Sequence, residues 1–193
     1  MKTFGRVLTA MITSFNEDGS VNIENTVAIA QHLLDHGSDG LVVCGTTGEN
    51  PTISRESKIA LFKAIAKACG DKGTIIANVG SNDTKGSVDF VKEVSAIPGI
   101  DGLLVVVPYY NKPNQQGQYL HFKSIAEATT LPIMVYNVPG RVGTGIFPAT
   151  LARLHKEYPH ICAIKEASGN LMIASEIKRL MPGDDFMVYS GDD

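Results

Sequence analysis

Seven short apolar segments rich in β-branched residues recur along the chain, each followed by turn residues and most of them then by a stretch with helical periodicity. Most of these segments are apolar almost throughout, which is typical of parallel strands covered on both faces. The pattern therefore predicts an α/β fold built from successive βα units. The predicted strands are Val7–Thr13, Gly40–Gly45, Thr74–Gly80, Gly102–Pro108, Ile133–Val138, Cys162–Ala167 and Met187–Gly191.

The segments between these strands predict helices that pack by one face. Apolar residues three or four positions apart define two such faces, at Ile23, Val27, Ala30 and Leu34 and at Ile59, Phe62, Ala66 and Cys69. Ser54 is placed to cap a helix start, and Gly37 and Gly70 lie where helices commonly end.

Seven βα units without a topological break favour a (β/α)₈ barrel, or TIM barrel, over an open sheet. No linker or low-complexity segment divides the chain, so we expect a single domain over residues 1–193. A complete barrel takes about 250 residues. Because this chain ends just after the seventh predicted strand, we expect a barrel truncated at that point, most simply a portion of a longer natural chain.

The composition and net charge of the chain exclude several classes of function. With 17 Lys and Arg against 20 Asp and Glu, the net charge of −3 excludes nucleic-acid backbone binding as a main task. No apolar run approaches the roughly 18 to 20 residues of a membrane span, and residues 1–6 do not resemble a signal peptide. We therefore expect a cytoplasmic protein without a membrane partner. Cys44, Cys69 and Cys162 form no disulfide or zinc pattern and are interpreted as small buried apolar residues.

Candidate chemistry lies at the carboxyl ends of the predicted strands, where barrel enzymes place their functional residues. The turn at residues 45–49 offers backbone N–H groups and two hydroxyls that could hold a carboxylate, although this motif taken alone favours a plain βα turn. Tyr109 and Tyr110 follow the fourth strand. Their positions are equally consistent with a packing role and with a catalytic role. Tyr136 lies near the end of the fifth strand, five residues before Arg141, whose guanidinium suits a carboxylate.

Lys165 lies within the apolar sixth strand. Burial lowers the pKa of a lysine and leaves a nucleophilic amine, which can form a Schiff base with a keto group. The alternative is a lysine at the strand end whose amine reaches solvent. His32 and His36 are spaced like two metal ligands on a helix, but no third ligand is near them in the sequence, so a surface helix without a metal is predicted.

In combination, these strand ends resemble the dihydrodipicolinate synthase (4-hydroxy-tetrahydrodipicolinate synthase) family of class I pyruvate-dependent aldolases, a group that includes N-acetylneuraminate lyase. The resemblance runs from the first strand to the last residue. The matching segments are Gly45-Thr46-Thr47-Gly48-Glu49, Pro108-Tyr109-Tyr110-Asn111, Tyr136-Asn137-Val138-Pro139-Gly140-Arg141, Ile164-Lys165-Glu166-Ala167 and Ser190-Gly191-Asp192-Asp193.

The resemblance implies a lyase that condenses pyruvate with aspartate 4-semialdehyde in lysine and diaminopimelate biosynthesis. Lys165 would form the Schiff base, and Tyr136, the general acid/base, would share a hydroxyl relay with Thr46 and Tyr110. Tyr110 would reach into a neighbouring subunit, which implies a homodimer or homotetramer. No cofactor or metal is implied, because the protonated imine is itself the electron sink.

Further residues are assigned to substrate binding by the same resemblance. Thr47 would belong to the pyruvate-carboxylate pocket, Gly191 would lie beside pyruvate, and Arg141 would hold the carboxylate of the semialdehyde. Arg141 and the Thr46-Thr47 pair favour the synthase over N-acetylneuraminate lyase. Another pyruvate-dependent aldolase and a catalytically silent fragment remain the alternatives.

Lysine inhibition is predicted to be weak or absent. Family members inhibited by lysine tend to have small residues after the Gly-Glu pair, histidines in the next helix and a glutamate after the third strand. This chain has other residues there, at Asn50, Pro51, Arg55, Lys58 and Gly86.

Overall fold

The computed structural model describes residues 4–191, which fall into two compact units. The first unit contains residues 4–78 and 93–103, and the second contains residues 79–92 and 104–191. The expectation of a single domain over residues 1–193 stays a prediction.

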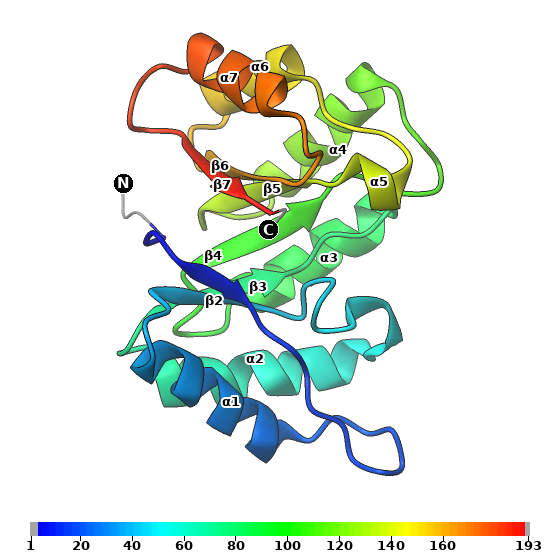
Figure 1. Cartoon of the computed structure of the whole chain (residues 1–193). Coiled ribbons are helices and arrows are strands. Elements are labelled where there is room, and N and C mark those ends of the chain that lie inside the picture. Colours follow the sequence, from blue (N-terminus) through cyan, green and yellow to red (C-terminus); the bar gives the residue numbers. More distant parts are fainter. Residues whose placement is uncertain (1–3, 192–193) are drawn as a thin grey trace. The chain divides into compact units, whose positions relative to one another are not determined.

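The first unit contains three parallel strands whose order follows the chain. Its elements are β1 (Leu8–Ala10), α1 (Ile23–Asp35), β2 (Gly40–Val43), the short 3₁₀ helix η1 (Asn50–Thr52), α2 (Arg55–Cys69) and β3 (Thr74–Asn78). Every residue of β2 and β3 is buried, as their apolar sequences predict. The two long helices pack side by side (Figure 1).

Local interactions set the helix ends of this unit. Asn22 accepts a hydrogen bond from Asn25 N–H at 2.9 Å, and Ser54 accepts one from Ser57 N–H at 3.1 Å, which confirms the predicted cap of α2. After α1, Gly37 has a left-handed φ of +108°, which glycine adopts without a Cβ penalty. Gly70 instead keeps a right-handed φ of −61° and closes α2 by an N–H···O bond to Ala66.

The buried faces of the two helices differ partly from the predicted ones. In α2, Phe62, Ala66 and Cys69 are buried as expected. In α1, Ala30 is buried together with the polar Thr26. The hydroxyl of Thr26 donates to Asn22 O and accepts from Ser14 N–H, so its burial leaves no unsatisfied polar group.

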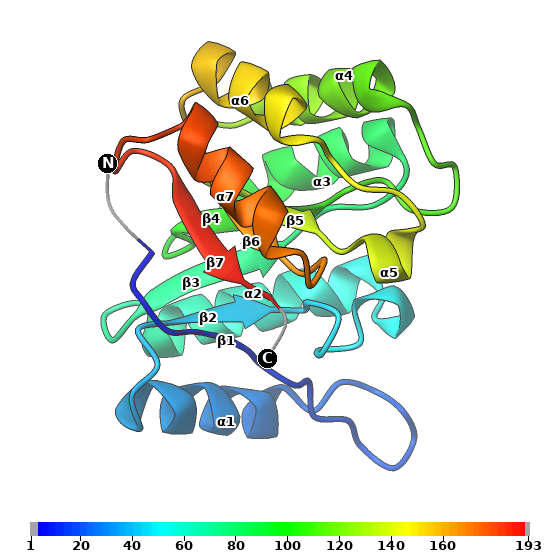
Figure 2. The ribbon, with the colours of Figure 1, turned by 45° about the horizontal axis from the view of Figure 1, so that its top comes forward.

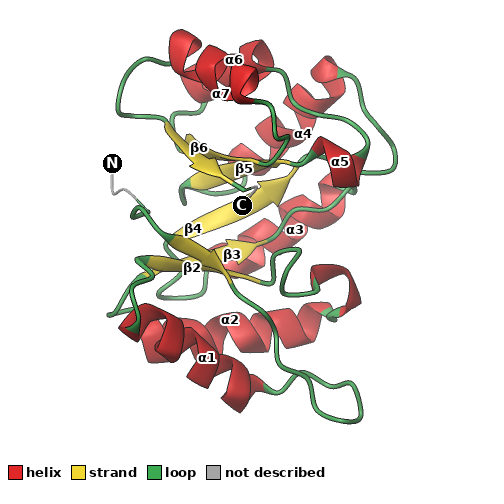
Figure 3. Ribbon diagram, viewed as in Figure 1, coloured by secondary structure: helices red, strands yellow, loops and turns green. Residues whose placement is uncertain are grey.

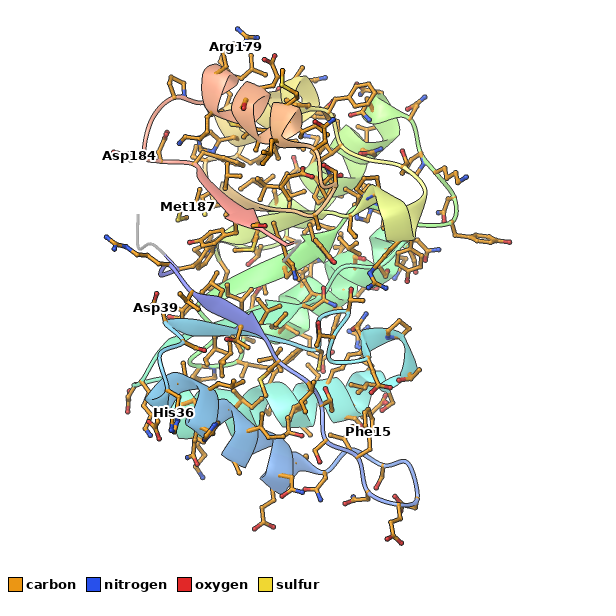
Figure 4. All side chains as sticks on the ribbon, in the orientation of Figure 1. Phe15, His36, Asp39, Arg179, Asp184 and Met187 are labelled. Carbon is orange, nitrogen blue, oxygen red and sulfur yellow. The ribbon has the colours of Figure 1, made fainter. Side chains whose placement is uncertain are left out.

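The second unit holds the later strands, again parallel and in chain order from β5 to β7. Its elements are α4 (Gln115–Ala126), β5 (Ile133–Asn137), α5 (Pro139–Val142), α6 (Pro148–Glu157), β6 (Ile161–Glu166), α7 (Leu171–Leu180) and β7 (Met187–Ser190), with α3 (Thr84–Ser95) and β4 (Gly102–Val106) contributing residues to both units. Helices α6 and α7 pack together (Figures 2 and 3). Figure 4 labels Met187, where β7 begins, and Asp184 in the preceding loop.

All seven predicted strands occur in the described residues, and most are shorter than predicted. The first is reduced to Leu8–Ala10, and the second ends before Cys44, whose left-handed φ of +54° turns the chain out of the strand. All three cysteines are free and buried, as predicted. None of the helices formed by residues 4–191 combines the length and the apolar character that crossing a membrane requires.

Candidate active site

Lys165 and Tyr136 lie at paired positions on the neighbouring strands β6 and β5. The Lys165 Nζ atom is 4.7 Å from the centroid of the Tyr136 ring, which is buried, while Lys165 itself is half-buried. An ammonium group at this distance is attracted to the negative face of the ring. The structure thus brings together the predicted Schiff-base lysine and the predicted general acid/base.

Gly191 passes directly beside the side chain of Lys165. Its N–H donates to Glu166 O at 2.8 Å, which continues the ladder beyond β7. A Cβ atom at this position would lie only 2.7 Å from Lys165 Cε and 2.8 Å from its Cγ. A side chain at Gly191 would therefore displace the lysine. Asp192 and Asp193, the last residues of the predicted motif, lie outside the described residues.

Glu166 and Asn137 form a buried pair that sequence reasoning did not assign. The Asn137 Nδ2 group donates to Glu166 Oε2 at 2.7 Å, and Ser168 N–H donates to Glu166 Oε1 at 2.8 Å. Ile146 N–H completes the network by donating to Asn137 Oδ1 at 3.1 Å. Both carboxylate oxygens are satisfied, so the network ties together the ends of β5 and β6 that carry Tyr136 and Lys165.

A signal for this pair was present in the sequence. Successive side chains of a strand point to opposite faces, so the carboxylate after Lys165 had to face away from the lysine. A buried carboxylate there requires hydrogen-bond donors. The identity of the donors, Asn137 and Ser168, comes only from the folded chain.

Arg141 and Tyr110 are exposed residues of the second unit. Arg141 lies on the one-turn helix α5, which ends at Gly143 with a left-handed φ of +75°. Tyr110 is 88% exposed and has a φ of +67°, an unusual conformation for a tyrosine. The structure does not bring the Tyr110 side chain into the buried group around Tyr136.

Thr46 and Thr47 belong to the first unit, in the turn that follows β2. Both are exposed, whereas the flanking Gly45 and Gly48 are buried. The turn is closed by two backbone hydrogen bonds, from Glu49 N–H to Thr46 O at 3.1 Å and from Asn50 N–H to Gly45 O at 3.3 Å. Two exposed threonines therefore lie on a turn that is fixed by backbone hydrogen bonds.

Cys44 precedes this turn and is chemically inert. Burial raises the pKa of its thiol to about 12, so the thiol is neutral at physiological pH. Burial also lowers the pKa of the nearby Lys58 amine. Cys44 thus acts by its backbone conformation and not as a nucleophile.

No group of three or more His, Cys, Asp or Glu residues between positions 4 and 191 is arranged to hold a metal ion. His32 and His36 lie at the end of α1, where their rings stack with centroids 4.0 Å apart (Figure 4 labels His36). The ring Nδ1 of His36 is 2.7 Å from His32 O, so this nitrogen forms a hydrogen bond to the backbone at the end of the helix.

The sequence matches a known protein family over almost the whole chain. The model of the dihydrodipicolinate synthetase family matches residues 3–193. The chain belongs to the dihydrodipicolinate synthetase family. Curated 4-hydroxy-tetrahydrodipicolinate synthases from Moorella thermoacetica and Desulforamulus reducens are 53% and 51% identical over 190 residues, which is 98% of this chain. The chain spans 64% of the length of these two relatives.

Solved members of the family have the same fold. The crystal structure of dihydrodipicolinate synthase from Bacillus anthracis matches with a TM-score of 0.96 and 44% identity, covering 100% of this chain and 65% of that one. The synthase from Cyanidioschyzon merolae, solved with lysine bound, matches with a TM-score of 0.94 and 44% identity, covering 98% of this chain and 64% of that one. The predicted α/β class, with seven parallel strands of a (β/α)₈ barrel, is confirmed.

Proposed function

We propose that the protein is a 4-hydroxy-tetrahydrodipicolinate synthase, which condenses pyruvate with aspartate 4-semialdehyde through a Schiff base on Lys165. The observation that carries this proposal is the position of Lys165 Nζ, 4.7 Å from the centroid of the buried Tyr136 ring. A lysine amine and a tyrosine hydroxyl on adjacent strand ends are the nucleophile and the proton carrier that imine chemistry needs.

The proposed reaction begins when the neutral Lys165 amine attacks the keto carbon of pyruvate and water leaves. Loss of a methyl proton from the resulting iminium gives an enamine, whose carbon attacks the aldehyde carbon of the second substrate and restores an iminium. The amino group of the second substrate then attacks the iminium carbon, which closes the ring and releases the Lys165 amine. Tyr136, with Thr46 and Tyr110, carries the protons of these steps. Thr47 and Gly191 flank pyruvate, and Arg141 pairs with the semialdehyde carboxylate. The iminium supplies the electron sink without a cofactor.

The proposal includes a homodimer or homotetramer that works in the cytoplasm. The conformation of Tyr110 supports the assembly, because a left-handed backbone and 88% exposure project this ring away from its own unit. A tyrosine held in this way can complete the site of a neighbouring subunit.

Borohydride trapping tests the proposed function. Pyruvate and sodium borohydride are expected to add one reduced pyruvate per chain, and peptide mapping is expected to place it on Lys165. The purified protein is then given pyruvate with aspartate semialdehyde, or N-acetylneuraminate alone. Consumption of the sugar acid would instead identify an N-acetylneuraminate lyase, and the absence of any adduct would favour a catalytically silent chain.

Replacing Arg141 with alanine is expected to raise the half-saturating concentration of aspartate semialdehyde roughly 10- to 100-fold, the equivalent of one charge-assisted hydrogen bond. Pyruvate trapping on Lys165 should remain, because the first half-reaction does not use this guanidinium. Arg179→Ala is the matched control, since Arg179 forms an exposed ion pair with Glu176 on α7. Equal effects of the two substitutions would refute the role of Arg141.

Lysine is expected to leave the activity of the complete protein unchanged at millimolar concentrations. Two cations occupy the first turns of α2: Arg55, whose Nη2 is 2.8 Å from Glu93 Oε2, and the half-buried Lys58. They repel the two amino groups of a lysine ligand. Initial rates measured with and without lysine check this expectation, and inhibition at millimolar lysine would contradict it.

A further inference from the structure

The turn that carries Thr46 and Thr47 is clamped at both ends by buried side chains. Asn78, the last residue of β3, donates from Nδ2 to Cys44 O at 2.8 Å. Thr13 donates from Oγ1 to Gly48 O at 2.8 Å. Asn78 is 5% exposed and Thr13 is 6% exposed, so neither bond is in competition with bulk water.

The first of these bonds acts on the strained point of the turn. Cys44 has a φ of +54°, a conformation that costs free energy in a non-glycine residue and persists only where the surroundings enforce it. Its peptide carbonyl is the group that Asn78 holds. The far end of the turn lies close by, because a Cβ atom at Gly48 would be 3.2 Å from Cys44 Cα.

The two polar groups of the Asn78 side chain differ in their hydrogen bonding. Its Nδ2 is bonded, whereas its buried Oδ1 has no hydrogen-bond partner in the described part of the chain. An unsatisfied buried acceptor destabilises the fold, so a residue that served only to fill this space would be better apolar. What the position gains from asparagine is the donor bond to Cys44 O.

We infer that Asn78 is a positioning residue for the turn that binds the pyruvate carboxylate. By fixing the Cys44 carbonyl, it sets the direction of the peptides and hydroxyls from Gly45 to Thr47. The inference rests on the proposed function for the identity of the ligand. Asn78 acts through the turn and touches no reacting atom.

Two substitutions of Asn78 test this role. Asn78→Asp keeps the size of the side chain but cannot donate when ionised. Asn78→Ser shortens the side chain by one bond, which withdraws the donor from Cys44 O without burying a charge. Both should raise the pyruvate concentration that half-saturates borohydride trapping by roughly five- to tenfold, the equivalent of one hydrogen bond. The maximal trapping rate should stay within about twofold of wild type, since the Lys165 amine is untouched.

The aspartate variant adds a pH signature. Once protonated, its carboxyl can donate to Cys44 O again. The ratio of its half-saturating concentration to that of wild type should therefore fall as the pH is lowered, while the ratio for Asn78→Ser stays constant. Thr9→Val is the matched control, because it removes one side-chain hydrogen bond of the same unit, to Ser38 Oγ, away from the turn.

Hydrogen–deuterium exchange separates failure of this inference from failure of the proposed function. In the ligand-free protein, amides 44–50 should exchange about tenfold faster in both Asn78 variants than in wild type or Thr9→Val, because one clamp is lost. Unchanged exchange, an unchanged half-saturating concentration, or an equal effect of Thr9→Val would overturn the role of Asn78. If wild type forms no adduct, the proposed function fails, and exchange at the turn still decides whether Asn78 positions it.

Discussion

Replacing Lys165 with alanine is expected to eliminate the borohydride-trapped pyruvate adduct and to lower kcat for the condensation at least about a thousandfold, which corresponds to roughly 4 kcal/mol. The physical reason is that the amine supplies the covalent bond and the electron sink, which no neighbouring hydroxyl can replace. Intact mass after trapping, followed by peptide mapping, measures the first effect. Initial rates with both substrates measure the second.

Lys165→Arg separates charge from nucleophilicity. An arginine can keep a positive charge over the Tyr136 ring, but a guanidinium remains protonated and does not form the imine. This variant should therefore fold and still trap no pyruvate. Lys85→Ala is the matched control, because Lys85 is an exposed lysine of the same unit, paired with Asp89 on α3. An adduct that survives in Lys165→Ala would show that another amine reacts.

Much of the fold could be predicted because buried parallel strands leave a local signal. Apolar β-branched runs mark β2 to β6 within a few residues. The ends of the strands depend on contacts that no local pattern contains. The first strand ends at Ala10, and the Thr13 hydroxyl donates a hydrogen bond to Gly48 O, 35 positions away. Thr26 can be buried in α1 because its hydroxyl bonds Asn22 O at the start of the helix and Ser14 N–H in the segment before it.

The residues of the candidate site likewise include some that the sequence predicts and some that it does not. A lysine in an apolar strand and a tyrosine at a strand end are visible in the sequence, and the family resemblance adds their roles. The supporting residues are not visible, because they act through partners distant in the chain. Asn137 bonds Glu166 29 positions away, and Asn78 bonds the carbonyl of Cys44 34 positions away. A buried polar side chain can be identified from its surroundings, but its partner is fixed only by strand register.

Gly191→Ala should slow pyruvate trapping at least about a hundredfold even at saturating pyruvate, because displacing a reacting group by about 1 Å costs roughly this factor. The new Cβ atom would lie 2.7 Å from Lys165 Cε and 3.0 Å from Ala167 Cβ. These distances are shorter than van der Waals contact, so the lysine stem must leave the position in which its amine lies over the Tyr136 ring. Gly191 does not have a positive φ, so alanine can adopt the same backbone conformation at this position.

The rate of borohydride trapping, measured at several pyruvate concentrations, checks this expectation. The control is Gly183→Ala in the loop before β7, where the new Cβ would meet the Asp185 carboxylate. This carboxylate lies 3.3 Å from His155 Nε2, but it is 69% exposed and can rotate into solvent. Because the clash at Gly191 displaces the stem that carries the reacting amine, the maximal rate should fall. The half-saturating pyruvate concentration should rise as well, since Gly191 flanks pyruvate in the proposed site. Wild-type trapping by a folded Gly191→Ala protein would mean that Lys165 reacts from a different position, and the pairing with Tyr136 would lose its role.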